Sequence, residues 1–172
     1  MTNQNRTGEA TVVQLDPPRF ENGRPILIAG LRGHFTPATW AGIPAQWDRL
    51  RSYGTIPGTI SGKVRSAHYG LCFNLSGGFD YLCGVEVAGL PGLPSEFSHV
   101  NIPAQRYAIF AHHEHVFKLH NTVDAIQHWF PSSGHEAARP AGGAPDFFER
   151  YGEGFNLETG TGDVEVWAPI KS

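Results

Sequence analysis

Asp163-Val164-Glu165-Val166-Trp167-Ala168-Pro169-Ile170 is the stretch that decides the expected fold. It alternates with the period of a half-buried β-strand, yet it carries a carboxylate among its valines. A similar stretch, residues 79–87, lies about half a chain earlier and places Glu86 between Val85 and Val87. Two acid-bearing strands in comparable positions predict a duplicated module with an acidic, aromatic-lined site between its halves.

The composition is that of a globular protein. The chain has 172 residues, of which 40% are hydrophobic, 12% aromatic and 17% charged, and its formal net charge is −3. This length suits one domain or two small fused modules. The slightly acidic balance argues against direct contact with nucleic acid. Because neither a membrane-spanning apolar run nor the apolar core of a signal peptide is found, we expect a cytoplasmic protein without membrane contact.

Cysteine and histidine residues give little indication of a cofactor. Cys72 and Cys83 are the only cysteines, and without export signals we expect free thiols rather than a disulfide. The run His112-His113-Glu114-His115 is typical of a metal site only if further ligands lie at suitable spacing, and the sequence offers none. We therefore expect neither a metal nor another cofactor.

Hydrophobic patterns predict an α+β fold. Strands are expected at residues 11–15, 25–35, 67–74, 81–87, 97–103, 105–112 and 163–170. Helices are expected at about residues 44–53, ended by Gly54, and around residues 119–130, stopped by Pro131. A single helical turn is expected over residues 145–150. The polar residues 1–10 are expected to form a flexible N-terminus.

Repeated motifs support the duplication. Tyr69-Gly70-x-x-Phe73-Asn74 recurs as Tyr151-Gly152-x-x-Phe155-Asn156, and Trp47 and Trp129 are separated by the same spacing. These matches predict two β-α-β-β modules, at about residues 11–90 and 97–170, related by a pseudo-twofold axis. Ligand sites favour such junctions.

A series of motifs, in order, resembles a known family. They are Pro-Pro-Arg-Phe (17–20), Ala-Gly-Leu-Arg (29–32), Tyr69-Gly70, Ile-Pro-Ala-x-x-Tyr-Ala (102–108), Glu-Arg-Tyr (149–151) and Glu-x-Trp-x-Pro-Ile (165–170). Their order and spacing over about residues 11–170 resemble the GyrI-like effector-binding superfamily. This family includes ligand domains of some AraC- and MerR-type regulators, stand-alone proteins and integron-associated proteins. The resemblance implies one domain over residues 11–172, with duplicated SHS2-like modules, an antiparallel sheet, two main helices and a central ligand cleft.

The resemblance also implies a ligand chemistry. The family's cleft takes flat, hydrophobic, often cationic compounds and holds a buried glutamate as counter-charge. Glu165 is the first candidate for this glutamate and Glu86 is its partner through the repeat, unless one or both point outward as solvated charges. Trp167 lies two residues from Glu165 and hence on the same strand face, where it is a stacking surface or a core residue.

Other aromatic side chains are candidates for the walls of the cleft. Tyr151 and Tyr69 begin corresponding segments, and each is expected to present its ring to a ligand or to pack in the core. Trp40 is placed near the entry of the first helix, where it borders the cleft or packs against its neighbours. For Trp47 and Trp129, packing between helix and sheet is the expectation.

Two function classes follow from these residues. The first is a stand-alone, non-enzymatic protein that binds small hydrophobic or cationic molecules, as a multidrug or effector sensor. A role in transcription regulation would then require a partner protein or a homodimer. The second is a hydrolase of strained, cyclopropane-containing genotoxins, as known for some GyrI-like proteins, with Glu165 and Tyr151 activating water.

Overall fold

One antiparallel sheet and two helices make up the fold, as expected for the α+β class. The structure, a computed structural model, describes residues 13–54 and 62–172. Its elements, in chain order, are β1 (Arg19–Gly23), β2 (Ile26–Phe35), the 3-10 helix η1 (Trp40–Gly42), α1 (Ile43–Gly54), β3 (Lys63–Leu75), β4 (Gly78–Val87), β5 (Ser98–Ile102), β6 (Gln105–His112), the 3-10 helix η2 (Val116–Lys118), α2 (Leu119–Ser133), β7 (Phe147–Tyr151) and β8 (Val164–Ile170). Within these residues, neither helix is long and apolar enough to cross a membrane.

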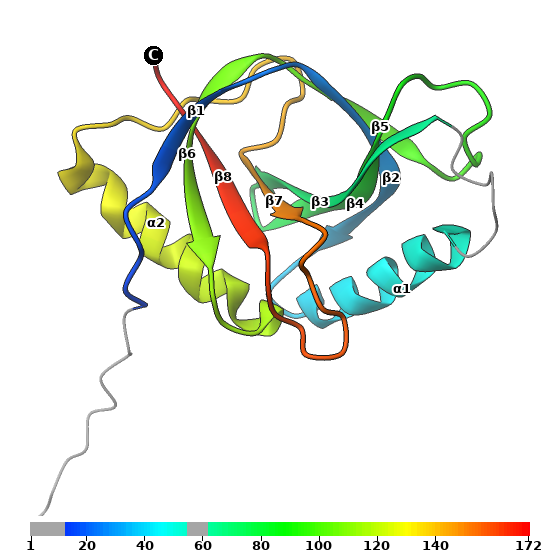
Figure 1. Ribbon diagram of the computed structural model, residues 1–172, viewed down its shortest axis with the longest axis horizontal. Helices are drawn as coiled ribbons and strands as arrows, with labels where there is room; N and C mark the ends of the chain where they lie inside the picture. Colours follow the sequence, from blue (N-terminus) through cyan, green and yellow to red (C-terminus); the bar gives the residue numbers. More distant parts are fainter. Residues whose placement is uncertain (1–12, 55–61) are drawn as a thin grey trace, which may run out of the picture.

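The sheet is strongly curved, and chain connectivity explains why. Its strand order is β1-β6-β8-β7-β3-β4-β2-β5, so β1 and β5 form opposite edges. Only Arg24 and Pro25 connect β1 to β2, and only Pro103 and Ala104 connect β5 to β6. Two residues span about 7 Å. The two sides of the sheet must therefore approach each other at this end, which is the arch at the top of Figure 1.

The curvature creates an inner face that is filled by its own side chains. On β3, Tyr69, Leu71 and Phe73 point to this face, and they pack with Leu82 and Phe148 in one buried cluster. The alternate residues of the same strand point to the other face, which the helices cover. We call these the inner face and the helix face.

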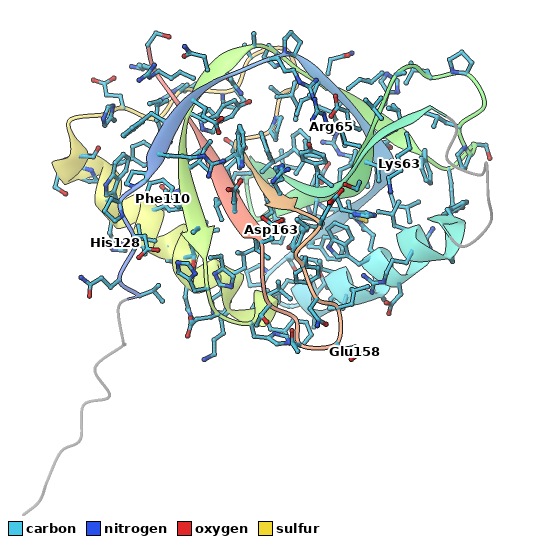
Figure 2. All side chains as sticks on the ribbon, viewed as in Figure 1. Lys63, Arg65, Phe110, His128, Glu158 and Asp163 are labelled. Atoms are coloured by element: carbon cyan, nitrogen blue, oxygen red, sulfur yellow. The ribbon has the colours of Figure 1, made fainter. Side chains whose placement is uncertain are left out.

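Each helix covers one half of the helix face. Helix α1 lies on β2 and β4, and the buried Gln46 side chain fixes it by donating hydrogen bonds to the carbonyl oxygens of Leu31 (2.9 Å) and Tyr81 (3.0 Å). Helix α2 packs on β6 and β8, with Phe110 between strand and helix (Figure 2). The central strands β7 and β3 run between the two helices (Figure 1).

Two of the expected elements are wrong, and both concern the sheet. Val13–Leu15, the described part of the first expected strand, has no regular structure, and the strand instead follows Pro17-Pro18 as β1. The helical turn expected over residues 145–150 is the central strand β7. Hydrogen bonding to β3 on one side and β8 on the other, together with burial of Phe148, outweighs the weak local preference of this short segment.

The end of α2 is also corrected. Pro131 lies inside the helix, which continues to Ser133 and ends before Gly134, whose φ of 76° is left-handed. A proline this close to the end removes one backbone donor only, and glycine is the residue best suited to the position after a helix. Helix α1 ends at Gly54, as expected.

The hairpin of β3 and β4 forms as expected, and it places both cysteines on the helix face. Cys72 pairs with Tyr81 and Cys83 with Gly70, so the thiols lie diagonally across the pair, and both are free and buried.

The order strand, helix, strand, strand occurs twice in the chain, although an origin by duplication stays a prediction. Tyr69 lies on the inner face and Tyr151 on the helix face, so these two residues are not equivalent.

Candidate ligand-binding site

The buried carboxyl group of Glu149 is the most unusual feature of the helix face. Glu149 lies in the central strand β7, opposite Gly70 of β3 and Val166 of β8. Only 7% of the residue is exposed. Alternation along β7 turns Phe147, Glu149 and Tyr151 to the helix face, and Phe148 and Arg150 to the inner face. The carboxyl group therefore lies between the two halves of the fold.

A chain of hydrogen bonds fixes this carboxyl group. The hydroxyl of Tyr81 donates to Glu149 Oε2 at 2.7 Å, and the hydroxyl of Tyr151 donates to the same oxygen at 2.8 Å. Trp47, from α1, donates its indole N–H to the Tyr81 oxygen at 3.1 Å. Such a network polarises each of its members and holds the rings in place.

Glu149 has no cationic partner, and its acidity reflects this. Burial raises the pKa of Glu149 from its ordinary value of 4.5 to about 7, and the two tyrosine hydrogen bonds oppose this rise only in part. No positively charged side chain of the described residues contributes to the pKa of Glu149. Burial and the nearby carboxylate also raise the pKa values of Tyr81 and Tyr151 well above 10, so both hydroxyls remain donors.

Aromatic rings surround the acid. The Trp47 and Tyr151 rings meet edge to face at 5.2 Å, and the Phe155 and Tyr151 rings meet in the same way at 5.1 Å. A depression of about 290 Å³ lies along α2, and its lining includes Val166, which pairs with Glu149, and Phe147, two residues before Glu149 on the same strand face. Glu149 and its two tyrosine partners do not line this depression. Aromatic faces and a buried carboxyl group are what a flat organic cation requires.

Glu165, the first candidate from the sequence, lies on the inner face and already has a cationic partner. Arg19 of β1 binds it with two hydrogen bonds, of 2.5 and 3.2 Å, and the Trp167 indole donates to it at 2.9 Å. Burial acts to raise the pKa of Glu165, but these hydrogen bonds hold it below its ordinary value. Its charge is therefore satisfied within the protein.

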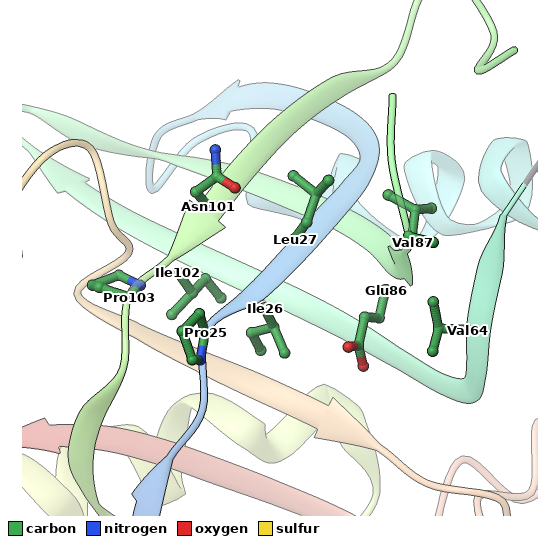
Figure 3. Close-up of a pocket in the computed structure, with 10 residues that line it drawn as sticks. Pro25, Ile26, Leu27, Val64, Glu86, Val87, Asn101, Ile102 and Pro103 are labelled. Atoms are coloured by element: carbon green, nitrogen blue, oxygen red, sulfur yellow. The ribbon is translucent and has the colours of Figure 1, made fainter. Parts of the chain in front are cut away.

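Glu86 has the same kind of environment at the other side of the inner face. Its side chain is 6% exposed and forms a two-pronged ion pair with Arg24, with distances of 2.7 and 2.8 Å. Arg65, labelled in Figure 2, lies 3.4 Å from the same carboxylate. Glu86 lines a depression of about 420 Å³ together with Ile26 and Val64 (Figure 3). Glu86 and Glu165 thus both lie on the inner face, but they pair with different arginines, Arg24 and Arg19.

The remaining candidates are divided between the two faces. Trp167 stacks on Phe148 at 5.3 Å within the inner core, and Tyr69 is buried in the same core. Trp40 is 44% exposed and touches His120 of α2 with its ring edge, at 5.3 Å. Of the six candidates, only Tyr151 contacts Glu149.

Sequence reasoning missed Glu149, Tyr81 and Trp47 as members of one site. Glu149 was missed because the sequence predicts a helical turn over residues 145–150, where the structure has the strand β7. An interpretation of the segment as a strand places Glu149 and Tyr151 on the same face, but the short local pattern does not favour a strand over a helical turn. For Trp47 the sequence predicts packing between helix and sheet, and its ring does pack there. The hydrogen bond from its indole N–H to the Tyr81 hydroxyl was not expected.

The pKa of Glu149 predicts a specific loss of stability at high pH. Between pH 4.5 and 7 the folded protein holds a proton that the unfolded chain has released, so rising pH lowers the free energy of unfolding. Glutamine keeps an oxygen for both tyrosines but does not titrate. From about pH 5.5 to 8.5, wild type should lose about 2 kcal/mol relative to Glu149→Gln in urea unfolding.

Glu165→Gln is the matched control. Because the pKa of Glu165 is lowered, its titration lies below this window, and the variant should be less stable than wild type by a constant amount at both pH values. Parallel pH profiles for wild type and Glu149→Gln would contradict the assignment of a buried, uncompensated acid.

Comparison with known proteins agrees with this architecture. No curated protein matches the chain in a sequence search. Among solved structures, SAV2435 bound to tetraphenylphosphonium is similar at a TM-score of 0.66 and 18% identity, over 90% of this chain and 94% of that chain. An integron cassette protein from Vibrio cholerae has a TM-score of 0.63 and 16% identity, over 91% and 97% of the two chains. The C-terminal domain of EcmrR has a TM-score of 0.67 and 11% identity, over 93% and 99%.

These likenesses show a shared fold, and the sequence itself gives the family. The model of the GyrI-like small molecule binding domain matches residues 16–171, nearly the whole chain. The match includes all described strands and both helices. The chain therefore belongs to the GyrI-like family of small-molecule binding domains.

Proposed function

We propose that this domain binds flat, hydrophobic organic cations between α1 and α2, with Glu149 as the counter-charge. One observation carries the proposal: Glu149 is a buried carboxyl group with a pKa of about 7 and no cationic partner among the described residues. A buried carboxylate without a partner is costly, and a bound cation removes that cost. The counter-charge thus moves from Glu165, the first candidate in the sequence, to Glu149.

The surroundings of Glu149 suit an aromatic or lipophilic cation. Trp47, Tyr81 and Tyr151 offer ring faces and edges beside the acid, and an aromatic face attracts a cation by about 0.5–2 kcal/mol. The apolar side chains Val123 and Ile126 of α2 line the depression along this helix, which also includes Val166, the residue paired with Glu149. The similar protein SAV2435 has been solved with tetraphenylphosphonium. This cation is lipophilic and presents four flat phenyl rings, although its phosphorus centre is tetrahedral.

The position of the acid at the centre of the sheet supports a sensing role. Both helices lie beside the central strands, so a ligand that enters between them changes how each helix rests on its half of the sheet. A partner chain or a second copy that binds to the helices would respond to this change in helix packing. The similarity to the EcmrR C-terminal domain is in keeping with such a role. We place this role in the cytoplasm.

Binding of tetraphenylphosphonium should depend on pH. The cation favours the ionised acid, whose population rises about thirtyfold from pH 5.5 to 8.5 for a pKa of about 7. Affinity measured by quenching of tryptophan fluorescence should therefore rise on the order of tenfold or more over this range. Glu149→Gln should bind at least about tenfold more weakly at pH 8.5 and show a flat profile.

Glu165→Gln provides the control for this measurement too, since Arg19 already neutralises Glu165. It should bind with wild-type affinity and keep the pH dependence. If Glu149→Gln binds as tightly as wild type while Glu165→Gln binds more weakly, the counter-charge lies on the inner face instead.

A hydrolase is the second candidate, and the same acid favours it. A general base works best when its pKa lies near the operating pH, as that of Glu149 does. Its carboxylate would take a proton from water while the water oxygen attacks a strained ring carbon. The ring C–C bond then breaks, and the proton passes to the carbon that leaves.

Turnover separates the two candidates. The hydrolase requires ring-opened product from a cyclopropane-containing electrophile, formed at a rate that rises with pH through about 7 and is lost in Glu149→Gln. Product analysis by mass spectrometry is the measurement. A protein that binds cations but forms no product from such compounds is a binding protein only.

A further inference from the structure

Gly70 occupies the centre of the sheet, directly beneath the acid. It pairs with Glu149 in β7 and with Cys83 in β4. The neighbouring residues Tyr69 and Leu71 point to the inner face, so a side chain at position 70 would point to the helix face. Gly70 is thus the position of β3 that faces the site between the helices.

On the helix face, the space next to Gly70 is occupied by the Tyr81 hydroxyl and the Glu149 carboxyl group. We call these two side chains, together with Tyr151, the acid cluster. A Cβ atom built on Gly70 would lie 2.5 Å from Glu149 Oε2 and closer still to the Tyr81 hydroxyl oxygen. Carbon and oxygen atoms do not approach so closely without a bond. Any side chain at this position would therefore exclude the hydroxyl and the carboxyl group from the place where they meet.

We infer that Gly70 is a positioning residue for Glu149. The missing side chain leaves the room in which the Tyr81 hydroxyl reaches Glu149 Oε2, and that hydrogen bond sets both the place and the acidity of the carboxyl group. The role of Gly70 in ligand binding rests on the proposed function, but its effect on the acid does not.

Other glycines of the sheet differ from Gly70 in what they would touch. A Cβ at Gly84 would lie 2.5 Å from the carbonyl oxygen of Ala29, and one at Gly30 would meet the carbonyl oxygen of Cys83. Those contacts are with backbone, so an alanine there disturbs strand pairing. At Gly70 the nearest atoms are side-chain ends, which can move. An alanine at position 70 therefore disrupts the acid cluster before it disrupts the sheet.

The test is the titration of Glu149 in Gly70→Ala, followed by carbon-13 NMR of the glutamate carboxyl groups and assigned with Glu149→Gln. We expect the midpoint to move from about 7 by on the order of one unit. It moves upward if the Tyr81 hydrogen bond is lost while the carboxyl group stays buried, and downward if the group is pushed toward water. A midpoint that stays at about 7 overturns the inference.

Two variants keep this test interpretable. Gly54→Ala is the matched control, because a Cβ there meets no atom of residues 13–54 and 62–172 within 4 Å, and it should leave the midpoint and the stability unchanged. Gly70→Ala combined with Tyr81→Phe removes the closest clash, so the pair should cost less free energy of unfolding than the sum of the single variants. Additive costs would contradict a steric conflict at this hydroxyl.

Binding of tetraphenylphosphonium to the same proteins separates this inference from the proposed function. If both hold, Gly70→Ala shifts the titration and binds at least about tenfold more weakly, while Gly54→Ala binds as wild type. A shifted titration with unchanged binding sustains the positioning role and removes Glu149 from the ligand site. An unchanged titration removes the positioning role, whatever the binding result.

Discussion

The arrangement of this protein depends on one constraint, a carboxyl group that must remain without a cationic partner inside the fold. Glu149 meets this constraint because the central strands β7 and β3 lie between the helices instead of beneath them. Two tyrosine hydroxyls stabilise the carboxylate, but they do not supply a charge. The pKa of about 7 measures what is left uncompensated. In the proposed function, a ligand with a positive charge completes the site and removes the cost of this destabilising residue.

Glu86 and Glu165 show what a structural acid looks like in the same sheet. Glu86 and Glu165 are each bound by an arginine through two hydrogen bonds, from Arg24 and Arg19. Both arginines belong to the segment that crosses from one side of the curved sheet to the other. These ion pairs fasten that segment to β4 and β8. The two glutamates of the inner face thus neutralise arginines of this segment, whereas Glu149 on the helix face has no cationic partner among the described residues.

Much of the fold could be predicted from the sequence, because it rests on local patterns. The β3–β4 hairpin, the helices and the acid-bearing strand β8 follow from alternation, helical spacing and turn residues. The strand β7 could not be predicted in this way. It is short, and its structure comes from pairing with strands far away in the sequence. Because a helical turn was expected in place of β7, Glu149 was not recognised as a candidate site residue.

The choice among the glutamates shows a second limit of sequence reasoning. Alternation tells which residues share a face, but not which arginine will reach a carboxylate. Arg19 and Glu165 lie far apart in the chain and meet because β1 pairs with β6, and β6 pairs with β8. The presence or absence of such a partner is the basis on which we propose Glu149 rather than Glu165 as the ligand-binding acid, and it follows only from the folded structure.

Proton release on ligand binding tests the central claim most directly. Isothermal titration calorimetry of tetraphenylphosphonium in buffers of different ionisation enthalpy counts the protons released. For an acid with a pKa of about 7 that becomes ionised on binding, the account predicts about half a proton at pH 7 and about 0.9 at pH 6. Binding to wild type without proton release at either pH would contradict the claim that Glu149 is the counter-charge.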